Sequence, residues 1–471
     1  MEVLTPDLCV IGGGSGGLSV AAGAVQMGAS VVLIEGHKMG GDCLNYGCVP
    51  SKALLAAGKA AHAMTAGAPF GVASTTPDVD FAAAKDHVRA VIASIEPHDS
   101  VERFEGLGCT VIQAMGKFVG PDEVEADGKR IRARRFVVAT GSRPWTPPIP
   151  GLDDVGYFTN ETIFDLRERP ARLLVIGAGP IGLEMAQAHR RLGCEVTVLE
   201  AAKALGKDDP ELAAIALEKL RGEGIDIREG AAVESARQDG ADKVLTLEGG
   251  EEIRGDAILA AVGRKANVEN LNLDAAGIET TRTGIKVDKG LRTTNRKAYA
   301  IGDVAGGLQF THVAGYQAGL VVRSALFRLP VTNRTDHVPW ATYTDPEIAQ
   351  VGMTEAEARE AHGDKLEVFR SEYAENDRAR AEGKTAGLCK VMIVKGKPVG
   401  ASIVGEKAGD LISIWALAIS KGLKVADVAG YVAPYPTYGE LPKRAAGAYF
   451  GPRLFESDFV KRAVRLLAKL G

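Results

Sequence analysis

The stretch Val10-Ile11-Gly12-Gly13-Gly14-Ser15-Gly16-Gly17 recurs later in the chain as Val175-Ile176-Gly177-Ala178-Gly179-Pro180-Ile181-Gly182. Each copy reads as an apolar run, a G-x-G-x-x-G turn, a helix-forming segment, a second apolar run and a closing acid. One shift of 165 positions relates the equivalent residues, taking Gly12 to Gly177, Gly28 to Gly193 and Glu35 to Glu200. The repeat predicts two copies of one strand–helix–strand unit, and therefore an α/β fold.

Each unit carries the residues that hold a dinucleotide. The first glycine makes the tight turn, the second lets the backbone approach a pyrophosphate, and the third allows close helix–strand packing. The free N–H groups at the helix start bind phosphate, and the closing acid accepts a hydrogen bond from a ribose hydroxyl. One such motif would be weak support, but two complete units predict two bound dinucleotides. The residues concerned are Gly12, Gly14, Gly17 and Glu35 in the first unit and Gly177, Gly179, Gly182 and Glu200 in the second.

Composition excludes several classes of protein. The chain has 471 residues, 46% of them hydrophobic, and a formal net charge of −4. A near-neutral chain has no bulk attraction for nucleic acid or anionic lipid. No apolar run reaches the roughly 20 residues of a membrane-spanning helix, and no export signal is visible. We therefore expect a cytoplasmic protein that binds neither nucleic acid nor membrane.

The residue pattern changes along the chain and indicates where the domains begin and end. The proline-rich residues 143–151 look like an interdomain crossing. From about residue 335 the pattern changes to strand-like runs at 388–394 and 398–404 and an apolar helix at 411–419, with no nucleotide motif. We expect residues 1–150 and 279–334 to form the first nucleotide-binding domain, 151–278 the second, and 335–471 an α+β domain.

Two of the six cysteines differ from the rest. Cys9, Cys109, Cys194 and Cys389 lie in or beside apolar runs and are expected to be buried small hydrophobes. Cys43 and Cys48 lie in a glycine-rich stretch, just before a helix-forming segment whose N-terminus would stabilise a thiolate. A zinc site would need two further ligands at suitable spacing, which the sequence lacks, so no metal site is expected. A redox pair is favoured over an incidental one.

Residues 41–52, Gly-Asp-Cys-Leu-Asn-Tyr-Gly-Cys-Val-Pro-Ser-Lys, are very similar to the redox-disulfide motif of the class I flavoprotein disulfide reductases, also called pyridine nucleotide-disulfide oxidoreductases. That family includes dihydrolipoamide dehydrogenase, glutathione reductase and mercuric reductase, and the resemblance covers essentially the whole chain. It implies two Rossmann-like domains, for FAD and for NAD, followed by an α+β dimerisation domain. It also implies a homodimer that acts on a small disulfide or other thiophilic acceptor.

The resemblance assigns further residues to the two cofactors. Lys52 is implied to lie near the flavin and to pair with Glu184, while Glu200 and Gly263 belong to the NAD site. Glu200 would repel a 2′-phosphate, and no arginine follows it directly, so NADH is preferred to NADPH. The flavin contacts implied by the resemblance are Gly12, Gly14, Gly17, Glu35, Gly116, Thr140, Gly141, Ser142, Asp303, Thr311 and His312.

The same resemblance implies a route for electrons. NADH reduces the flavin, which opens the Cys43–Cys48 disulfide. Cys48 is implied to be the thiol nearer the ring, and its thiolate makes a charge-transfer contact. Cys43 is implied to be the exposed thiol that exchanges with substrate. For His312, packing against the flavin edge is favoured over a catalytic role.

The pattern breaks near the C-terminus. Related disulfide reductases have a histidine, oriented by a glutamate, that shuttles protons to the partner subunit's thiols. Here Glu440 matches the glutamate, but Tyr435 stands in place of the histidine. A phenol with a reference pKa of about 10 is a poor base near neutrality. Dihydrolipoamide oxidation should therefore be weak.

Other functions stay open beside a small-disulfide reductase. Mercuric reductase also resembles this chain in having tyrosine at that position, but it needs a C-terminal cysteine pair that the sequence lacks. The alternatives are a mercuric-type metal-ion reductase, a dihydrolipoamide dehydrogenase with an atypical acid–base residue, and a redox-sensing flavoprotein with little turnover. Tyr431 and Tyr438 are expected at an interface or surface, and the charged residues 375–384 as a solvated loop.

Overall fold

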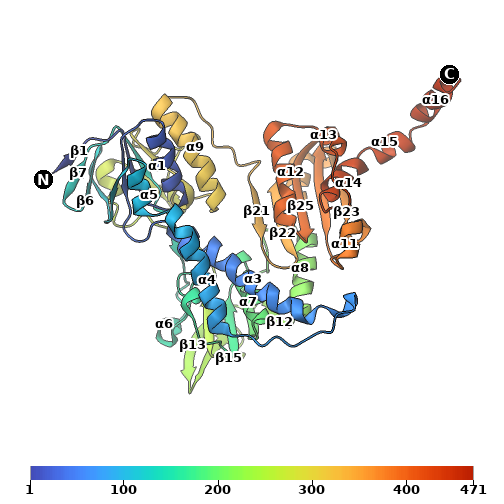
Figure 1. Ribbon diagram of the computed structural model, residues 1–471, viewed down its shortest axis with the longest axis horizontal. Helices are drawn as coiled ribbons and strands as arrows, with labels where there is room; N and C mark the ends of the chain where they lie inside the picture. The colour runs from blue at the N-terminus through green and yellow to red at the C-terminus, as the bar shows by residue number, and fades with distance from the viewer. Residues whose placement is uncertain (1, 470–471) are drawn as a thin grey trace.

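The computed structural model describes residues 2–469, which form three connected regions (Figure 1). The first nucleotide-binding unit lies at the left of the view beside a later segment of the chain, drawn in yellow. The second unit, in green, lies below, and the C-terminal region, in orange and red, lies at the right. The long helices α3 (Cys48–Thr65) and α4 (Phe81–Ile95) run between these regions.

A five-stranded parallel sheet forms the centre of the first region, in the order β20-β8-β2-β3-β4. Its strands are almost unbroken apolar runs because both faces are covered. One face packs under helices α1 (Ser15–Gln26) and α9 (Thr311–Phe327). The other face packs against a second sheet, β1-β7-β6-β5. The strands are β20 (Ala298–Ala300), β8 (Arg135–Val138), β2 (Leu8–Ile11), β3 (Val31–Ile34), β4 (Thr110–Ile112), β1 (Val3–Leu4), β7 (Lys129–Ile131), β6 (Glu123–Ala126) and β5 (Lys117–Gly120).

The second region repeats this plan with the parallel sheet β12-β11-β10-β16. Its first helix, α7 (Pro180–Arg191), is related to α1 by the 165-residue shift found in the sequence. Helix α8 (Pro210–Gly222) follows it, and an antiparallel meander of three strands covers the outer side. The strands are β12 (Ile225–Glu229), β11 (Glu195–Glu200), β10 (Arg172–Ile176) and β16 (Ala257–Ala260), with β13 (Val233–Asp239), β14 (Asp242–Leu247) and β15 (Glu252–Gly255) in the meander.

The glycine turns of the two units have the same geometry, and each glycine has a steric reason. Gly12 has φ +110° and Gly177 φ +104°, in the left-handed region where a side chain is strained. A Cβ on Gly17 would lie 1.8 Å from the carbonyl oxygen of Gly12, so no other residue allows the helix to pack this close. These are the roles predicted for the first and third glycines of the motif.

The C-terminal region is an α+β domain built on the antiparallel sheet β21-β22-β25-β24-β23. Its core surrounds the fully buried Trp415 on helix α12 (Ala408–Lys421), together with α13 (Val425–Gly430) and α14 (Glu440–Ala448). The strands are β21 (Pro339–Thr342), β22 (Glu347–Gly352), β25 (Lys397–Gly405), β24 (Leu388–Val394) and β23 (Leu366–Glu372). The expected fold class, with its two α/β nucleotide-binding units and α+β domain, is confirmed.

Buried charges join the second and third regions. The Lys390 ammonium on β24 lies 2.8 Å from the Asp209 carboxylate at the start of α8, and both side chains are at most 3% exposed. The Arg191 guanidinium at the end of α7 lies 2.9 Å from the carboxylate of Asp345, which stands between β21 and β22. Each ion pair links a helix of the second nucleotide-binding unit to the C-terminal sheet.

Several local expectations can be compared with the structure. The four cysteines expected in the core, Cys9, Cys109, Cys194 and Cys389, are buried. Tyr438 was expected at an interface or surface, but this is wrong: it is 5% exposed and its hydroxyl donates 2.7 Å to Glu382. The charged residues 375–384 are not simply a loop, because α11 (Asp377–Ala381) lies within them and buries Ala379. None of the described helices is long and apolar enough to cross a membrane.

Candidate active site

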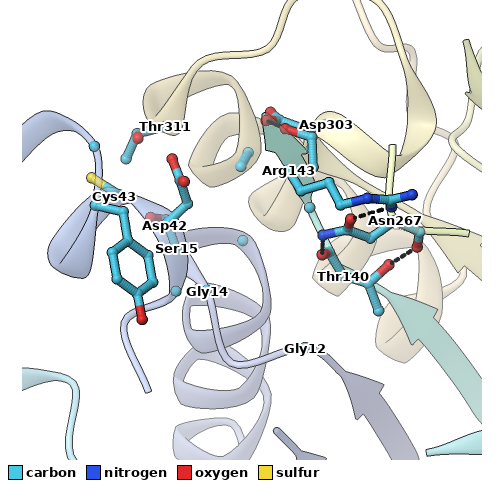
Figure 2. Close-up of a pocket in the computed structure, with 18 of the residues that line it drawn as sticks. Gly12, Gly14, Ser15, Asp42, Cys43, Thr140, Arg143, Asn267, Asp303 and Thr311 are labelled. Carbon is cyan, nitrogen blue, oxygen red and sulfur yellow. Dashed lines mark hydrogen bonds between the residues drawn. The ribbon is translucent and has the colours of Figure 1, made fainter. Parts of the chain in front are cut away.

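A cavity of about 960 Å³ extends from the glycine turn of the first unit to the cysteine pair (Figure 2). Its size is at the upper end of the roughly 300–1,000 Å³ typical of ligand sites. The expected site residues that line it are Gly12, Gly14, Glu35, Cys43, Cys48, Lys52, Gly116, Thr140, Gly141, Ser142, Glu184, Asp303, Thr311 and His312. Residues far apart in the sequence thus share one elongated volume.

The acids that close the two units are held in the same way. The Glu35 carboxylate accepts hydrogen bonds from the backbone N–H groups of Gly13, at 2.5 Å, and His37, at 2.6 Å. Glu200 accepts from Ala178 and Ala202, each at 2.9 Å. These partners are related by the same 165-residue shift. The backbone therefore fixes each carboxylate at the carboxyl edge of its sheet, where a ribose would reach it.

The start of α1 provides a cradle for phosphate. Its N-cap, Gly14, has extended backbone and no capping side chain. A Cβ on Gly14 would have only the Cα of Gly41 nearby, at 3.8 Å, so the approach to the helix N-terminus is open. This end of the helix lines the cavity together with Glu35. An open helix start beside a fixed carboxylate fits the pyrophosphate and ribose of FAD.

A polar cluster crosses the cavity between Asp42, beside Ser15 at the start of α1, and Asp303 on the other side (Figure 2). The Ser142 hydroxyl donates 2.5 Å to the Asp303 carboxylate, and burial raises the pKa of Asp303. Arg264 donates 2.7 Å to the Ser142 hydroxyl and lies 3.1 Å from the carboxylate of Asp42, the residue before Cys43. One guanidinium thus ties the Ser142–Asp303 pair to the cysteine segment.

A second polar connection fixes the wall beside Ser142. The Thr140 hydroxyl donates 2.7 Å to the backbone oxygen of Asn267, and the Asn267 side-chain amide donates 2.9 Å back to the backbone carbonyl oxygen of Thr140. Arg143 donates 3.0 Å to the Asn267 side chain and also pairs with Glu269. This network holds the connection that follows β8, at residues 140–142, against the segment near residue 267.

The two thiols lie at helix starts. Cys43 is in the short helix α2 (Gly41–Asn45), and Cys48 is the first residue of α3. Cys48 Sγ lies 3.4 Å from the hydroxyl oxygen of Thr311, the first residue of α9. The thiolate form of Cys48 therefore faces the N-termini of two long helices, α3 and α9, which favour negative charge.

The surroundings separate the pKa values of the two thiols. A hydrogen bond from Cys43, with smaller contributions from Thr311 and the positive charge of Lys52, lowers the pKa of Cys48 to about 6 against the cost of burial. The hydrogen bond to Cys48 and burial raise the pKa of Cys43. Near neutral pH the reduced pair thus holds one thiolate, on Cys48, and one thiol, on Cys43. Because the two groups interact strongly, they titrate as a coupled pair.

Exposure of the thiols differs from the expectation. The resemblance implied that Cys43 is the exposed thiol, but in the structure Cys48 is exposed and Cys43 is half-buried. Both thiols line the cavity, and the exposed surface of Cys48 opens into it beside Thr311. The exposure of Cys48 is therefore exposure to this cavity.

Lys52 is held one helical turn after Cys48. Its ammonium lies 2.8 Å from the Glu184 carboxylate on α7, which is buried. It also lies 4.3 Å from the centre of the Tyr343 ring, and the Tyr343 backbone N–H donates 2.9 Å to the other oxygen of Glu184. All three regions of the chain thus meet at this cation.

Tyr435 and Glu440, the two expected site residues near the C-terminus, do not line the cavity. Tyr435 is 71% exposed, and its hydroxyl donates 3.1 Å to the Asp377 carboxylate, which raises the pKa of the phenol above its usual value. Glu440 begins α14, and its nearest cation is Arg444, at 3.8 Å. In related proteins the matching glutamate orients the histidine, whereas here the Tyr435 hydroxyl donates to Asp377.

Two family models match most of the chain. Residues 6–318 match the model of the pyridine nucleotide-disulphide oxidoreductases, and residues 338–446 match the dimerisation domain of these proteins. The chain belongs to this family. It is therefore a flavoprotein disulfide oxidoreductase of a family that uses FAD and a pyridine nucleotide, and it carries the family's dimerisation domain.

Relatives of the oxidoreductase have different names. Mercuric reductase from Bacillus cereus is 38% identical over 447 residues, covering 93% of this chain and 70% of that one. Dihydrolipoyl dehydrogenase from Thermus scotoductus is 36% identical, covering 94% and 97%. The Cu(II) complex of the HOCl-induced flavoprotein disulfide reductase RclA from Escherichia coli superposes with a TM-score of 0.84 at 28% identity, covering 93% and 98%.

Sequence reasoning about the oxidoreductase missed several residues of the site. Tyr343, Arg264, Asn267 and Asp42 line the cavity and fix its principal groups. Asp42 could have been found, since it stands directly before Cys43. Tyr343 carried no local signal. The expected site residues that do not line the cavity are Gly17, Gly177, Gly179, Gly182, Glu200, Gly263, Tyr435 and Glu440.

Proposed function

We propose that this oxidoreductase passes electrons from NADH, by way of FAD, to the Cys43–Cys48 pair and on to a small disulfide or other thiophilic acceptor. The observation that carries the proposal is the placement of Cys48 in the cavity, where Cys43, Thr311 and Lys52 lower its thiol pKa to about 6. A thiolate at neutral pH is the reactive form of sulfur in exchange with disulfides or soft metal ions.

The two sulfurs would divide the work according to their pKa values. Cys48 would hold the negative charge, stabilised by Thr311 and by the helix starts. Cys43 would keep its proton until an acceptor engages it, and its S–H would donate to Cys48 meanwhile. Lys52, fixed by Glu184, would supply a steady positive charge beside the thiolate. No proton has to leave Cys48 during turnover near neutral pH.

The cavity and the second glycine turn would hold the cofactors. The flavin, when bound, would supply two-electron chemistry between nucleotide and sulfur. We assign residues 1–150 and 279–334 to its domain, with the contact residues given above. Residues 151–278 would hold the pyridine nucleotide through Gly177, Gly179, Gly182, Gly263 and the Glu200 carboxylate. That carboxylate would accept a 2′-hydroxyl and repel a 2′-phosphate, so NADH is favoured.

We propose that the active form is a homodimer that joins through residues 335–471. Tyr435 is exposed and lies outside the cavity of its own chain, as does Glu440. In a dimer each subunit would present this pair to the thiols of the other. The phenol, whose pKa Asp377 raises, would donate a proton or hydrogen bond and would not serve as a base near neutrality.

A mercuric-type metal-ion reductase is the second candidate. Tyr435 favours it, as do several relatives with that name. Against it, residues 390–471 contain no cysteine, and Cys389 is buried, so these residues supply no C-terminal thiol pair of the kind implied for that enzyme. Dihydrolipoamide dehydrogenation would suffer from the missing base. A redox sensor would be reduced by NADH but slowly reoxidised.

One experiment separates these functions. The FAD-loaded enzyme is assayed for NADH oxidation with lipoamide, glutathione disulfide, other small disulfides, quinones, and Hg(II) in excess thiol. Disulfide turnover that is lost in both Cys43→Ala and Cys48→Ala supports the proposal. Turnover with Hg(II) alone supports the second candidate. Rapid reduction with no rapid acceptor supports a sensor, and turnover independent of both cysteines would refute the thiol assignment.

A further inference from the structure

The last described helix, α16 (Asp458–Leu467), has two distinct faces. At 100° per residue, its apolar side chains fall on one side of the helix axis and its charged side chains on the other. The apolar face contains Phe459, Val460, Ala463, Val464, Leu466 and Leu467. The charged face contains Asp458, Lys461, Arg462 and Arg465, and Lys469 continues it just beyond the helix.

The apolar face has no partner among the described residues of this chain, and α16 lies beyond residues 338–446, which match the family's dimerisation domain. No residue of α16 is buried, and Phe459 is 80% exposed, Leu467 64% and Val464 60%. Phe455, at the end of the preceding helix α15 (Gly451–Phe455), is 76% exposed as well. Figure 1 shows α15 and α16 leading away from the C-terminal sheet into open space. Exposed apolar surface gathered on one helix indicates a surface that contacts something else.

The charged face indicates what that contact is. Four of its five ionisable groups are cationic, and the one acid, Asp458, lies at the helix start, where it favours the helix itself. A helix face that contacts only water or another protein does not require charges of one sign. Lysine and arginine beside a stripe of Phe, Leu and Val are typical of helices that lie in the headgroup layer of anionic membranes.

We propose that α16 docks the enzyme on an anionic phospholipid surface. The helix would lie parallel to the bilayer, with Phe459, Val464 and Leu467 among the acyl chains. Its cations would extend their long stems back to the lipid phosphates. The net charge of −4 does not indicate this site, because a whole-chain sum does not show that several cations are gathered on one short helix. The helix is too short to span the bilayer and would bind reversibly.

The test uses the FAD-loaded, full-length enzyme and sedimentation with vesicles of phosphatidylcholine alone or containing a third phosphatidylglycerol. Binding is expected only to the anionic vesicles and should weaken as salt rises. Two variants address the two faces, Phe459→Ser/Leu467→Ser and Lys461→Glu/Arg465→Glu. Each should lower the partition coefficient by about tenfold or more. Flavin content and NADH-dependent activity should be unchanged.

Matched controls carry the same changes elsewhere on the surface. Met27→Ser/Leu329→Ser removes two exposed apolar side chains, and Arg282→Glu/Lys289→Glu reverses two exposed charges. Both should bind vesicles like the parent. Equal binding by the α16 variants, or no binding by the parent, would overturn the proposal. Dissociation of the dimer by Phe459→Ser/Leu467→Ser would overturn it too, because a second copy would then cover this face.

Discussion

Lys52 and Glu184 stand 132 positions apart in the sequence, yet their side-chain nitrogen and oxygen atoms lie 2.8 Å apart beside the cysteine pair. Glu184 is buried and also accepts the Tyr343 backbone N–H, so the lysine is anchored to a rigid partner. A fixed cation one turn after Cys48 stabilises the thiolate and so lowers the pKa of that thiol. Substitution of either partner of the Lys52–Glu184 ion pair should therefore change the pKa of Cys48.

Removing the anion should strengthen the effect of the cation. Glu184→Gln keeps an oxygen for the Tyr343 N–H but no longer offsets the charge of Lys52. We expect the pKa of Cys48 to fall below about 6. Lys52→Met should raise it, by up to about one unit for a half-exposed charge. The measurement is the pH dependence of iodoacetamide alkylation in the reduced enzyme. Lys59→Met is the control. Lys59 lies on the same helix as Lys52 and pairs with Glu406, and its loss should leave the pKa of Cys48 unchanged.

The coupling of the two thiols can be measured directly. Cys43→Ala removes the hydrogen-bond donor that lowers the pKa of Cys48 most, so that pKa should rise from about 6. In Cys48→Ala, the pKa of Cys43 should fall, because the bond to Cys48 is the main cause that raises it. Mass spectrometry after alkylation at a series of pH values gives both curves. Unshifted curves would show that the sulfurs do not interact.

The long-wavelength absorbance of the two-electron-reduced enzyme provides an independent test of which sulfur holds the charge. Neither single-cysteine variant has a disulfide to accept electrons, so each is examined with its flavin oxidised. We expect the band to be absent in Cys48→Ala and present in Cys43→Ala, with its pH midpoint raised. Persistence in Cys48→Ala would assign the thiolate to Cys43 and reverse the roles proposed here.

Tyr435 makes a prediction about acid–base chemistry. Tyr435→His introduces a group with a pKa near 6.5, which can take a proton from a dithiol. We expect oxidation of dihydrolipoamide, measured with NAD⁺, to increase about tenfold or more, within the range that general bases contribute. Tyr435→Phe, which loses only the hydroxyl bonded to Asp377, should show no such gain. An equal response of the two variants would mean that position 435 does not limit this reaction.

Glu200 makes a prediction about the nucleotide. Its carboxylate is fixed by two backbone N–H groups, so it cannot turn away from a 2′-phosphate. Glu200→Ala should raise kcat/KM for NADPH relative to NADH by about tenfold, since one repelling charge is removed. Glu195→Ala, at the exposed start of the same strand, is the control. A parent enzyme that already prefers NADPH would contradict the assignment.

Lys390 makes a prediction about stability. Its ammonium is 2% exposed and lies 2.8 Å from Asp209. Lys390→Met would leave the Asp209 carboxylate buried without its cation, so the free energy of unfolding should fall by about 3–5 kcal/mol. Urea unfolding followed by circular dichroism measures the change. Lys397→Met, at the exposed start of β25, should alter stability by less than about 0.5 kcal/mol.

The repeated units were predictable because their determinants are local. Gly12 and Gly17 act within one turn, and Glu35 closes the same strand–helix–strand unit, so residue type and spacing identify all three. The helix start at Cys48 was predictable for the same reason. By contrast, the contact of Cys48 with Thr311 joins residues 263 positions apart, and the resemblance supplied only their shared neighbourhood.

Other features depend on packing between regions and left no trace in the sequence. Tyr343 reaches Lys52 only because β21 ends beside α7. Tyr438 was misplaced because an aromatic residue in a proline-rich turn shows no periodicity, and the partner that buries it, Glu382, comes from a distant helix end. The amphipathic face of α16 lies in the sequence itself, but whole-chain charge concealed it.

The ion pairs of Lys390 with Asp209 and of Arg191 with Asp345 also have a mechanical consequence. They fasten two successive helices of the second nucleotide-binding unit to the C-terminal sheet, so this lobe cannot swing as a hinged flap. In the proposed function, admission of the nicotinamide would then depend on side chains that line the cavity, such as Ile181, which is 40% exposed.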